Sequence, residues 1–116
     1  MRVLITGGLG FIGINLIKSL LNSKKVKKII IIDNMSKNSD HYLKTICKYT
    51  QSTSRYIPSK SRVHLIKACI TDAKVAQQAT KNIDFVTHLA AESGVDLSIK
   101  NPMRAFNTNV IGAFNY

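Results

Sequence analysis

Cysteine and proline are scarce in this sequence of 116 residues, where each occurs only twice, and tryptophan is absent. Cys47 and Cys69 are too far apart to form a metal-binding or redox motif, and two thiols build no disulfide framework. With only six glycines besides, the composition is not that of a collagen-like or low-complexity chain. These shortages exclude disulfide-rich secreted scaffolds and zinc modules, and they favour a cytoplasmic protein with reduced cysteines.

Long apolar runs are also missing from the sequence. The longest, residues 29–32, is ended by Asp33, whereas a membrane helix needs about 20 apolar residues. Glycines follow Met1 within a few residues, which is too early for the apolar stretch of about 7–15 residues in a signal peptide. We therefore expect neither a membrane span nor a secretory signal.

Acidic residues are few: six Asp and Glu stand against 17 Lys and Arg, which gives a formal charge of +11. Such a positive field speeds the approach of phosphorylated ligands, nucleic acid or anionic surfaces, and it says nothing about the fold. The densest cluster, at residues 24–28, is typical of a solvated turn after a helix, where cations suit the carboxyl end. Because no aromatic residues interleave it as stacking platforms, the cluster does not favour a nucleic-acid partner, although nucleic-acid binding stays open as a third hypothesis.

Hydrophobic residues make up 45% of the chain, which is enough for the core of one domain. Short apolar, β-branched runs predict buried strands at residues 2–6, 28–33, 63–67 and 83–89. Apolar residues at steps of three and four predict helices at residues 11–21, 41–48 and 73–80, and a last helix opens at Asn101 and Pro102. Residues 50–60, rich in Ser, Thr and Gln, are predicted to form a loop.

Strands that alternate with helices require a parallel sheet with right-handed crossovers. The sequence therefore predicts an α/β domain over residues 1–116, a partial doubly wound (Rossmann) sheet of about four strands with helices on both faces. In the last helix, we expect Met103, Phe106, Val110 and Phe114 to mark the buried face.

The strongest local signal lies between the first strand and the first helix, in the segment TGGLGFIG at residues 6–13. Gly8, Gly10 and Gly13 give the spacing GxGxxG, and Gly7 with the last two gives GxxGxxG. One glycine must take the tight turn, one must let backbone amides approach a pyrophosphate, and one must let helix and strand pack closely. The phosphate charge then rests on the amino end of the helix, so the segment predicts a dinucleotide-binding turn.

Asp33 stands twenty residues after Gly13, at the end of the second strand. A carboxylate at this place can accept hydrogen bonds from both ribose hydroxyls of NAD and repels the 2′-phosphate of NADP. The alternative is that Asp33 only caps the turn that follows it. With the glycines in place, the sequence favours the cofactor role and NAD as the cofactor.

Three further segments carry a resemblance: HLAAESGVD at residues 88–96, SIKNP at 98–102 and TNVIG at 108–112. Together with the glycine turn and the Asp33–Asn34 pair, they resemble the extended short-chain dehydrogenase/reductase family, specifically its NAD-dependent nucleotide-sugar epimerases and dehydratases. The resemblance covers essentially the whole chain. It implies tightly held NAD that oxidises a sugar hydroxyl transiently and returns the hydride after epimerisation or elimination.

The resemblance also implies roles for individual residues. Small side chains after the fourth strand would let the backbone approach the dinucleotide, and Asn109 would lie near the nicotinamide, unless it is only a helix-surface amide. Ser93 matches a position that faces the sugar nucleotide or the cofactor. The cofactor-binding residues implied in this way are Gly7, Gly10, Phe11, Ile12, Gly13, Asp33, Asn34, Ile70, Leu89, Ala90, Ala91 and Asn109.

Two departures from the family pattern limit what the resemblance implies. Cys69 stands where relatives carry an aspartate that accepts from the adenine amino group, so adenine recognition is expected to be weaker, although Ile70 can still donate its backbone amide. The family's Tyr-x-x-x-Lys pair has no counterpart after the fourth strand, and the same spacing between Tyr56 and Lys60 falls ahead of the third strand, where it is a coincidence. We therefore expect no catalytic residue in this chain, which is truncated relative to the family and inactive alone.

The sequence leaves the reaction class open. The segment AAES at residues 90–93, followed by Val95 and Asp96, resembles 4,6-dehydratases. Gly94 and Leu97 replace the His and Arg that this subgroup usually shows, which favours the NAD-binding part of an epimerase. A non-catalytic dinucleotide-binding remnant is the remaining alternative. The apolar strand at residues 83–89 would be an exposed edge, so self-association or a complementary chain that completes the nucleotide-sugar site is the expected partner.

Overall fold

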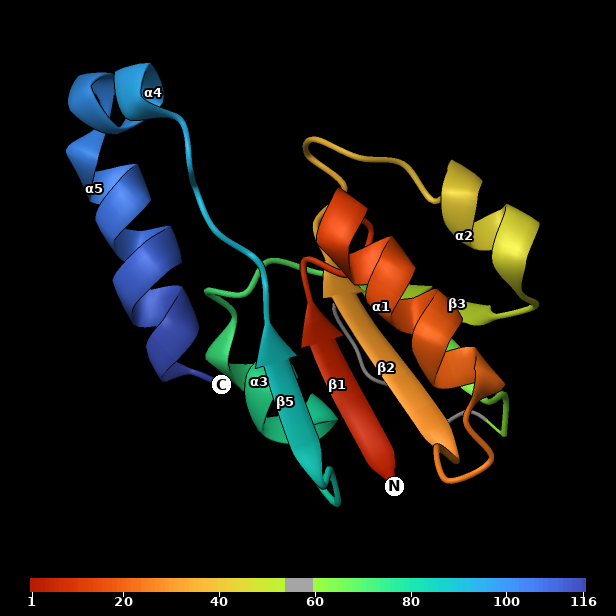
Figure 1. The fold of residues 1–116 in the computed structure, drawn as a ribbon. Coiled ribbons are helices and arrows are strands. Elements are labelled where there is room, and N and C mark those ends of the chain that lie inside the picture. The colour runs from red at the N-terminus through yellow and green to blue at the C-terminus, as the bar shows by residue number, and fades with distance from the viewer. Residues whose placement is uncertain (54–59) are drawn as a thin grey trace.

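A computed structural model describes residues 1–53 and 60–116 of the chain. Five parallel strands form one sheet in the order β3-β4-β2-β1-β5, and helices cover both of its faces (Figure 1). The elements are β1 (Arg2–Thr6), α1 (Phe11–Asn22), β2 (Lys28–Asp33), α2 (His41–Ile46), β3 (Thr50–Thr53), β4 (Val63–Lys67), α3 (Ala73–Ala79), β5 (Phe85–His88), α4 (Val95–Lys100), α5 (Pro102–Phe106) and the π-helical turn η1 (Asn107–Gly112). The predicted α/β class with a doubly wound parallel sheet is therefore confirmed.

The central strands are rich in branched apolar residues because helices cover them on both sides. All six residues of β2, KIIIID, are buried. In β1, Leu4 lies opposite Ile30 of β2 on one side and opposite Val86 of β5 on the other. The strand order thus reverses between β1 and β5, and such a reversal opens a crevice at the carboxyl ends of the strands.

Each face of the sheet has its own core. On one face, Ile5, Ile29 and Ile31 pack with Ile17 of α1 and Leu43 of α2. On the other, Leu4, Ile30, Ile32 and Ile66 pack with Val75 of α3. Alternate residues of one strand therefore serve opposite cores, as the side-chain period of a strand requires.

One predicted loop is partly a strand. Thr50–Thr53 is β3, which pairs with β4 at the edge of the sheet, so the loop predicted at residues 50–60 is wrong there. An edge strand needs few apolar side chains, and in β3 the hydroxyls of Thr50 and Ser52 instead lie 2.7 and 2.9 Å from the ring nitrogens of His64. Residues 54–59, with Tyr56 of the Tyr-x-x-x-Lys coincidence, lie outside the described residues.

The expected apolar face of the last helix is also wrong. Met103, Phe106, Val110 and Phe114 are 63%, 49%, 49% and 87% exposed. Met103 and Phe106 are exposed within α5 itself, and beyond them the helix widens into η1, whose extra residue per turn can rotate only Val110 and Phe114 away from a stripe of 3.6-residue spacing. The face that packs inward carries Gly112, which is buried. The preceding helix, α4, was not predicted, and none of its residues is buried.

The strand predicted at residues 83–89 is the shorter β5, which lies at the edge of the sheet beside β1 (Figure 1). Phe85 and Val86 of this strand are 58% and 39% exposed. Within the two described ranges, no helix is long and apolar enough to cross a membrane.

Candidate functional site

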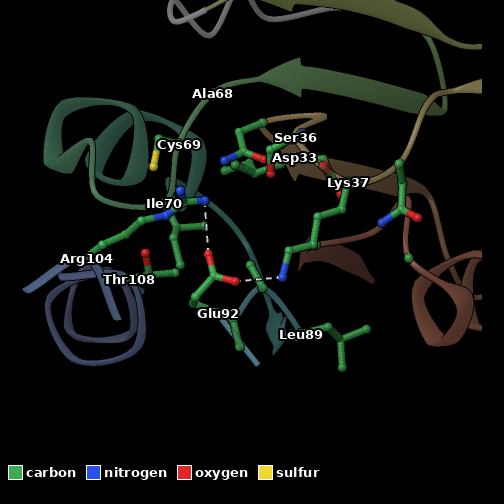
Figure 2. Close-up of a pocket in the computed structure, with 17 residues that line it drawn as sticks. Asp33, Ser36, Lys37, Ala68, Cys69, Ile70, Leu89, Glu92, Arg104 and Thr108 are labelled. Atoms are coloured by element: carbon green, nitrogen blue, oxygen red, sulfur yellow. Dashed lines mark hydrogen bonds and ion pairs between the residues drawn. The ribbon is translucent and has the colours of Figure 1, made fainter. Parts of the chain in front are cut away.

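A pocket lies at the carboxyl ends of β1, β2, β4 and β5, where the strand order reverses (Figure 2). The segments that follow these four strands form its walls, and α5 and η1 add one residue each. The lining residues are Gly7, Gly10, Ile32, Asp33, Asn34, Ser36, Lys37, Asn38, Ala68, Cys69, Ile70, Leu89, Ala90, Ala91, Glu92, Arg104 and Thr108. The topology of the sheet thus brings together residues far apart in the sequence.

The turn between β1 and α1 needs glycine for close approach. Gly7 has a φ of +65°, and a Cβ atom there would lie 2.7 Å from the backbone nitrogen of Ala90. The Gly10 N–H donates to the Gly7 carbonyl at 3.1 Å, and the next residue begins α1. A side chain at Gly7 would therefore push the wall after β5 away from the turn.

The amino end of α1 is open. Gly10 provides no side-chain cap, and the first turn of the helix has no acidic residue. Phe11 and Ile12 are 86% and 66% exposed. The first N–H groups of a helix lack partners within it and carry a partial positive charge, so they are suited to an anion.

Gly13 serves packing rather than the pocket. A Cβ atom at this position would lie 2.5 Å from the carbonyl oxygen of Gly8. The helix can therefore approach the glycine turn only because this residue has no side chain. Gly13 does not line the pocket.

Asp33 is 8% exposed, and its carboxylate organises the wall after β2. One oxygen accepts from the Leu9 N–H at 3.1 Å, and the other accepts from the Met35 N–H at 2.9 Å. The bond to Met35, whose φ is 56°, is the turn-capping interaction, and the bond to Leu9 ties this wall to the glycine turn. Each oxygen keeps a second lone pair for a ligand hydroxyl.

The wall after β4 consists of Ala68, Cys69 and Ile70. The Thr71 hydroxyl donates to the Cys69 sulfur at 3.1 Å, and the Asn115 amide donates to the Ile70 carbonyl at 3.0 Å. The Cys69 side chain offers a weak sulfur acceptor, which is not a carboxylate. Burial raises the pKa of the neighbouring Tyr116 hydroxyl above its ordinary value.

The wall after β5 is anchored by two polar side chains. The Thr6 hydroxyl accepts from the N–H groups of Leu89 and Ala90 at 3.2 and 3.3 Å. Two residues later, the Glu92 backbone makes two bonds with the Asn109 amide: its N–H donates at 2.8 Å and its carbonyl accepts at 2.9 Å. Both sets of contacts hold the backbone after β5 in place at the pocket.

Ion pairs cross the open side of the pocket. Glu92 accepts from Lys37 at 2.7 Å and lies 3.0 Å from the guanidinium of Arg104 (Figure 2). The hydrogen bond from Lys37 and the charge of Arg104 lower the pKa of the Glu92 carboxyl, although burial opposes them. In the described part of the chain, no cluster of three or more His, Cys, Asp or Glu could hold a metal ion.

Residues 4–116 match the family model described as GDP-mannose 4,6 dehydratase. The chain belongs to the NAD-dependent nucleotide-sugar epimerase and dehydratase family. The family expected from the sequence is therefore confirmed.

Three relatives illustrate the membership. A dTDP-glucose 4,6-dehydratase of Mycobacterium tuberculosis is 32% identical over 114 residues, which are 98% of this chain and 31% of that protein. The solved dTDP-glucose 4,6-dehydratase DesIV of Streptomyces venezuelae, with NAD and TYD bound, is 28% identical at a TM-score of 0.78 and covers 99% of this chain and 34% of that chain. The UDP-glucose 4-epimerase of Thermus thermophilus, in complex with NAD, is 26% identical at a TM-score of 0.72. The match covers 99% of this chain and 32% of that chain. This chain thus spans about a third of the length of the relatives it matches.

The structure gathers most of the residues expected to bind the cofactor of this family, but not all of them. Eight line the pocket: Gly7, Gly10, Asp33, Asn34, Ile70, Leu89, Ala90 and Ala91. Phe11 and Ile12 lie beside it at the open end of α1. Asn109 lies behind the wall, where its amide is bonded to the Glu92 backbone, and Ser93 is exposed and outside the lining.

Sequence reasoning missed the ion-pair cluster of Lys37, Glu92 and Arg104. Lys37 and Glu92 are 55 positions apart in the sequence, and Arg104 lies on a different element, α5. Glu92 lies within the quoted segment HLAAESGVD, but the segment does not show that its carboxylate is buried. Only the folded arrangement reveals the cations on either side of it.

Proposed function

We propose that this chain binds NAD in the pocket at the carboxyl ends of the strands, as the cofactor-binding part of a nucleotide-sugar epimerase. The observation that carries the proposal is the convergence of the glycine turn, the open amino end of α1 and the Asp33 carboxylate on one pocket. A pyrophosphate fits the glycine turn, because no side chain fills the space at Gly7 and Gly10. A ribose diol fits the carboxylate.

Within this proposal, different residues bind different parts of the dinucleotide. The N–H groups of Phe11 and Ile12 bind the pyrophosphate, which can approach closely at Gly10, while Asp33 and Asn34 hold the adenosine ribose. Ile70 donates its backbone amide to the adenine. Leu89, Ala90 and Ala91 allow the close approach of the rest of the dinucleotide, and NAD supplies hydride transfer when it is bound. Asn109 acts indirectly, through the backbone of Glu92.

The test is calorimetric titration of NAD and of NADP into the chain and its Asp33 variants. NAD should bind more tightly than NADP, because the Asp33 carboxylate repels a 2′-phosphate. Asp33→Ala should weaken NAD binding about tenfold or more, since a bond to a charged acceptor contributes about 1.5–3 kcal/mol. Because Asp33 also accepts from two backbone N–H groups, thermal melts must show that the variant is folded.

Asp33→Asn is the matched control for the charge. It keeps one acceptor oxygen and the size of the side chain, so it should retain more NAD affinity than Asp33→Ala and should lose discrimination against NADP. Absence of NAD binding by the folded wild-type chain would refute the proposal and would favour a non-catalytic remnant.

Two residues near α4 support one reaction class for the whole protein. Gly94 and Leu97 stand where the dehydratase subgroup usually has His and Arg, which supports epimerisation. The family model and the M. tuberculosis relative support 4,6-dehydration as the second candidate. Mass spectrometry of a nucleotide sugar incubated with the chain and a complementary catalytic part separates them. An epimerase leaves the mass unchanged, and a dehydratase yields a product lighter by one water.

The same assay tests the proposed partner. We propose that the chain acts on a nucleotide sugar only together with the part that supplies the Tyr-x-x-x-Lys pair, because that pair follows the cofactor-binding part in the family. Turnover by the chain alone would contradict this, and turnover only after mixing would support it.

A further inference from the structure

A buried carboxylate joins two walls of the pocket. The Glu92 side chain is 6% exposed, whereas those of its partners Lys37 and Arg104 are 48% and 55% exposed. Lys37 belongs to the loop after β2, and Arg104 belongs to α5. Because one anion is shared by two cations, Glu92 can lose one partner and remain paired.

Glu92 is also fixed through its backbone. The Asn109 amide accepts from its N–H and donates to its carbonyl, at 2.8 and 2.9 Å. The carboxylate therefore has a set position at the pocket wall, while both of its partners have long, partly exposed side chains that can move. What distinguishes Lys37 from Arg104 is the loop that carries it.

The loop that carries Lys37 borders the place where a phosphate would bind. The Asn38 side-chain nitrogen lies 4.0 Å from the position that a Cβ atom would take on Gly10. From this side of the glycine turn, the Lys37 side chain extends across the pocket to Glu92 on the opposite wall (Figure 2). Lys37 thus lines the same pocket as Gly7 and Gly10 of the glycine turn.

We propose that Glu92 competes with the diphosphate of a ligand for the Lys37 ammonium, and that Arg104 makes the exchange possible by keeping the buried carboxylate paired. This inference rests on the proposed function, because it deepens the same site. It makes Lys37 a phosphate-binding residue and Glu92 a determinant of affinity. Arg104 is a positioning residue that acts through Glu92.

The exchange predicts an unusual order of affinities. Glu92→Gln frees Lys37 and should tighten NAD binding about threefold, the size expected for one partly exposed ion pair. Lys37→Met should weaken it by about the same factor. Arg104→Met leaves Lys37 as the sole partner of Glu92 and should also weaken NAD binding, and adding Glu92→Gln should reverse that loss.

The experiment is calorimetric titration of wild type and these variants with NAD, inorganic pyrophosphate and adenosine. Pyrophosphate affinities should follow the order for NAD, and adenosine, which has no phosphate, should bind equally to all. Asp96→Asn and Lys44→Met are matched charge controls outside the pocket and should leave every affinity unchanged. Thermal melts establish folding, and Lys37→Met, which changes a half-exposed side chain, still decides the question if Glu92→Gln does not fold.

The outcomes separate the two proposals. NAD binding that Glu92→Gln leaves unchanged or weakens would overturn the exchange while the proposed function stands. Failure of wild type to bind NAD, with pyrophosphate affinities still in the expected order, would refute the proposed function alone. A structural role for the ion pairs predicts that all three single variants lower the melting temperature with no gain of affinity in any, which also overturns the exchange.

Discussion

The Thr6 hydroxyl lies 2.8 Å from Nδ1 of His88, and this contact joins the ends of β1 and β5. The same oxygen accepts from the N–H groups of Leu89 and Ala90. Since both of its lone pairs are used, its proton is directed to Nδ1, and the neutral imidazole carries its own proton on Nε2. Burial, which lowers the pKa of His88, favours the same neutral form.

Thr6→Val tests the importance of this junction for stability. The substitution keeps the shape and removes the side-chain acceptor of the Leu89 and Ala90 N–H groups, of which Leu89 still donates to the Thr6 carbonyl at 3.0 Å. We expect the free energy of unfolding to fall by about 1–3 kcal/mol in a urea titration. Thr71→Val is the control, because the exposed Thr71 hydroxyl contacts only the Cys69 sulfur among the described residues. Equal losses in the two variants would contradict the importance of the junction.

Two histidines predict how stability depends on pH. Burial lowers the pKa of His64, with a further contribution from the charge of Lys28, and burial lowers the pKa of His88. The unfolded chain therefore binds more protons than the folded chain below the ordinary value of 6.5. The free energy of unfolding should fall as the pH drops from 6.5 toward the folded pKa values.

Urea titrations from about pH 7.5 to about pH 5 check this dependence. His64→Gln should reduce the slope, and His41→Gln, at an exposed site in α2, should retain it. Asp40 and Glu92 have lowered pKa values and ordinary values of 3.8 and 4.5, so their contribution is lost only at lower pH. A flat profile between pH 6.5 and 5 would be inconsistent with neutral imidazoles at His64 and His88.

Gly13→Ala should destabilise the fold more than Gly94→Ala. Its methyl group would lie 2.5 Å from backbone of Gly8, so helix and turn must separate, at a cost of about 1–3 kcal/mol. Gly94→Ala is the control, because its φ is −78° and a Cβ there meets only the Leu97 side chain, at 3.3 Å. Chemical unfolding of both variants measures the difference, and equal stabilities would contradict the close packing.

The β5 edge predicts concentration-dependent self-association. Its apolar side chains are exposed, and within residues 1–53 and 60–116 no strand pairs with its outer side. Phe85→Lys should lower the association measured by sedimentation velocity. Met103→Lys, at a 63% exposed position on α5, should have less effect. Association that depends on Met103 and not on Phe85 would assign the interaction to the helix.

Much of the fold is predictable because apolar periodicity is strong where both cores are built. The predicted bounds of β1, β2 and β4 equal those observed, since each strand is a continuous run between polar residues. β3 has no such signal, because its stability comes from pairing with β4 and from hydroxyl contacts to His64. The last helix fails for another reason: apolar spacing cannot show which side of a helix packs inward, and a π-helical turn also changes the period for Val110 and Phe114.

In the site too, some residues are predictable from the sequence and others are not. The glycine turn and Asp33 are recognisable because backbone geometry there demands particular residues at fixed spacing. The contact between Glu92 and Lys37 joins residues 55 positions apart, and no local pattern predicts it. Asn109 was expected near the nicotinamide, yet its amide is bonded to the Glu92 backbone, which only the tertiary structure reveals.

The most direct test of the central claim is titration of the isotope-labelled chain with NAD, followed by the chemical shifts of its backbone amides. We expect the amides of Gly10, Phe11 and Ile12 to shift as the pyrophosphate binds the amino end of α1, together with those after β2 and β4. Asp33→Ala should reduce these shifts at equal NAD concentration. Shifts confined to the basic segment at residues 24–28, or no shifts in the folded chain, would contradict it.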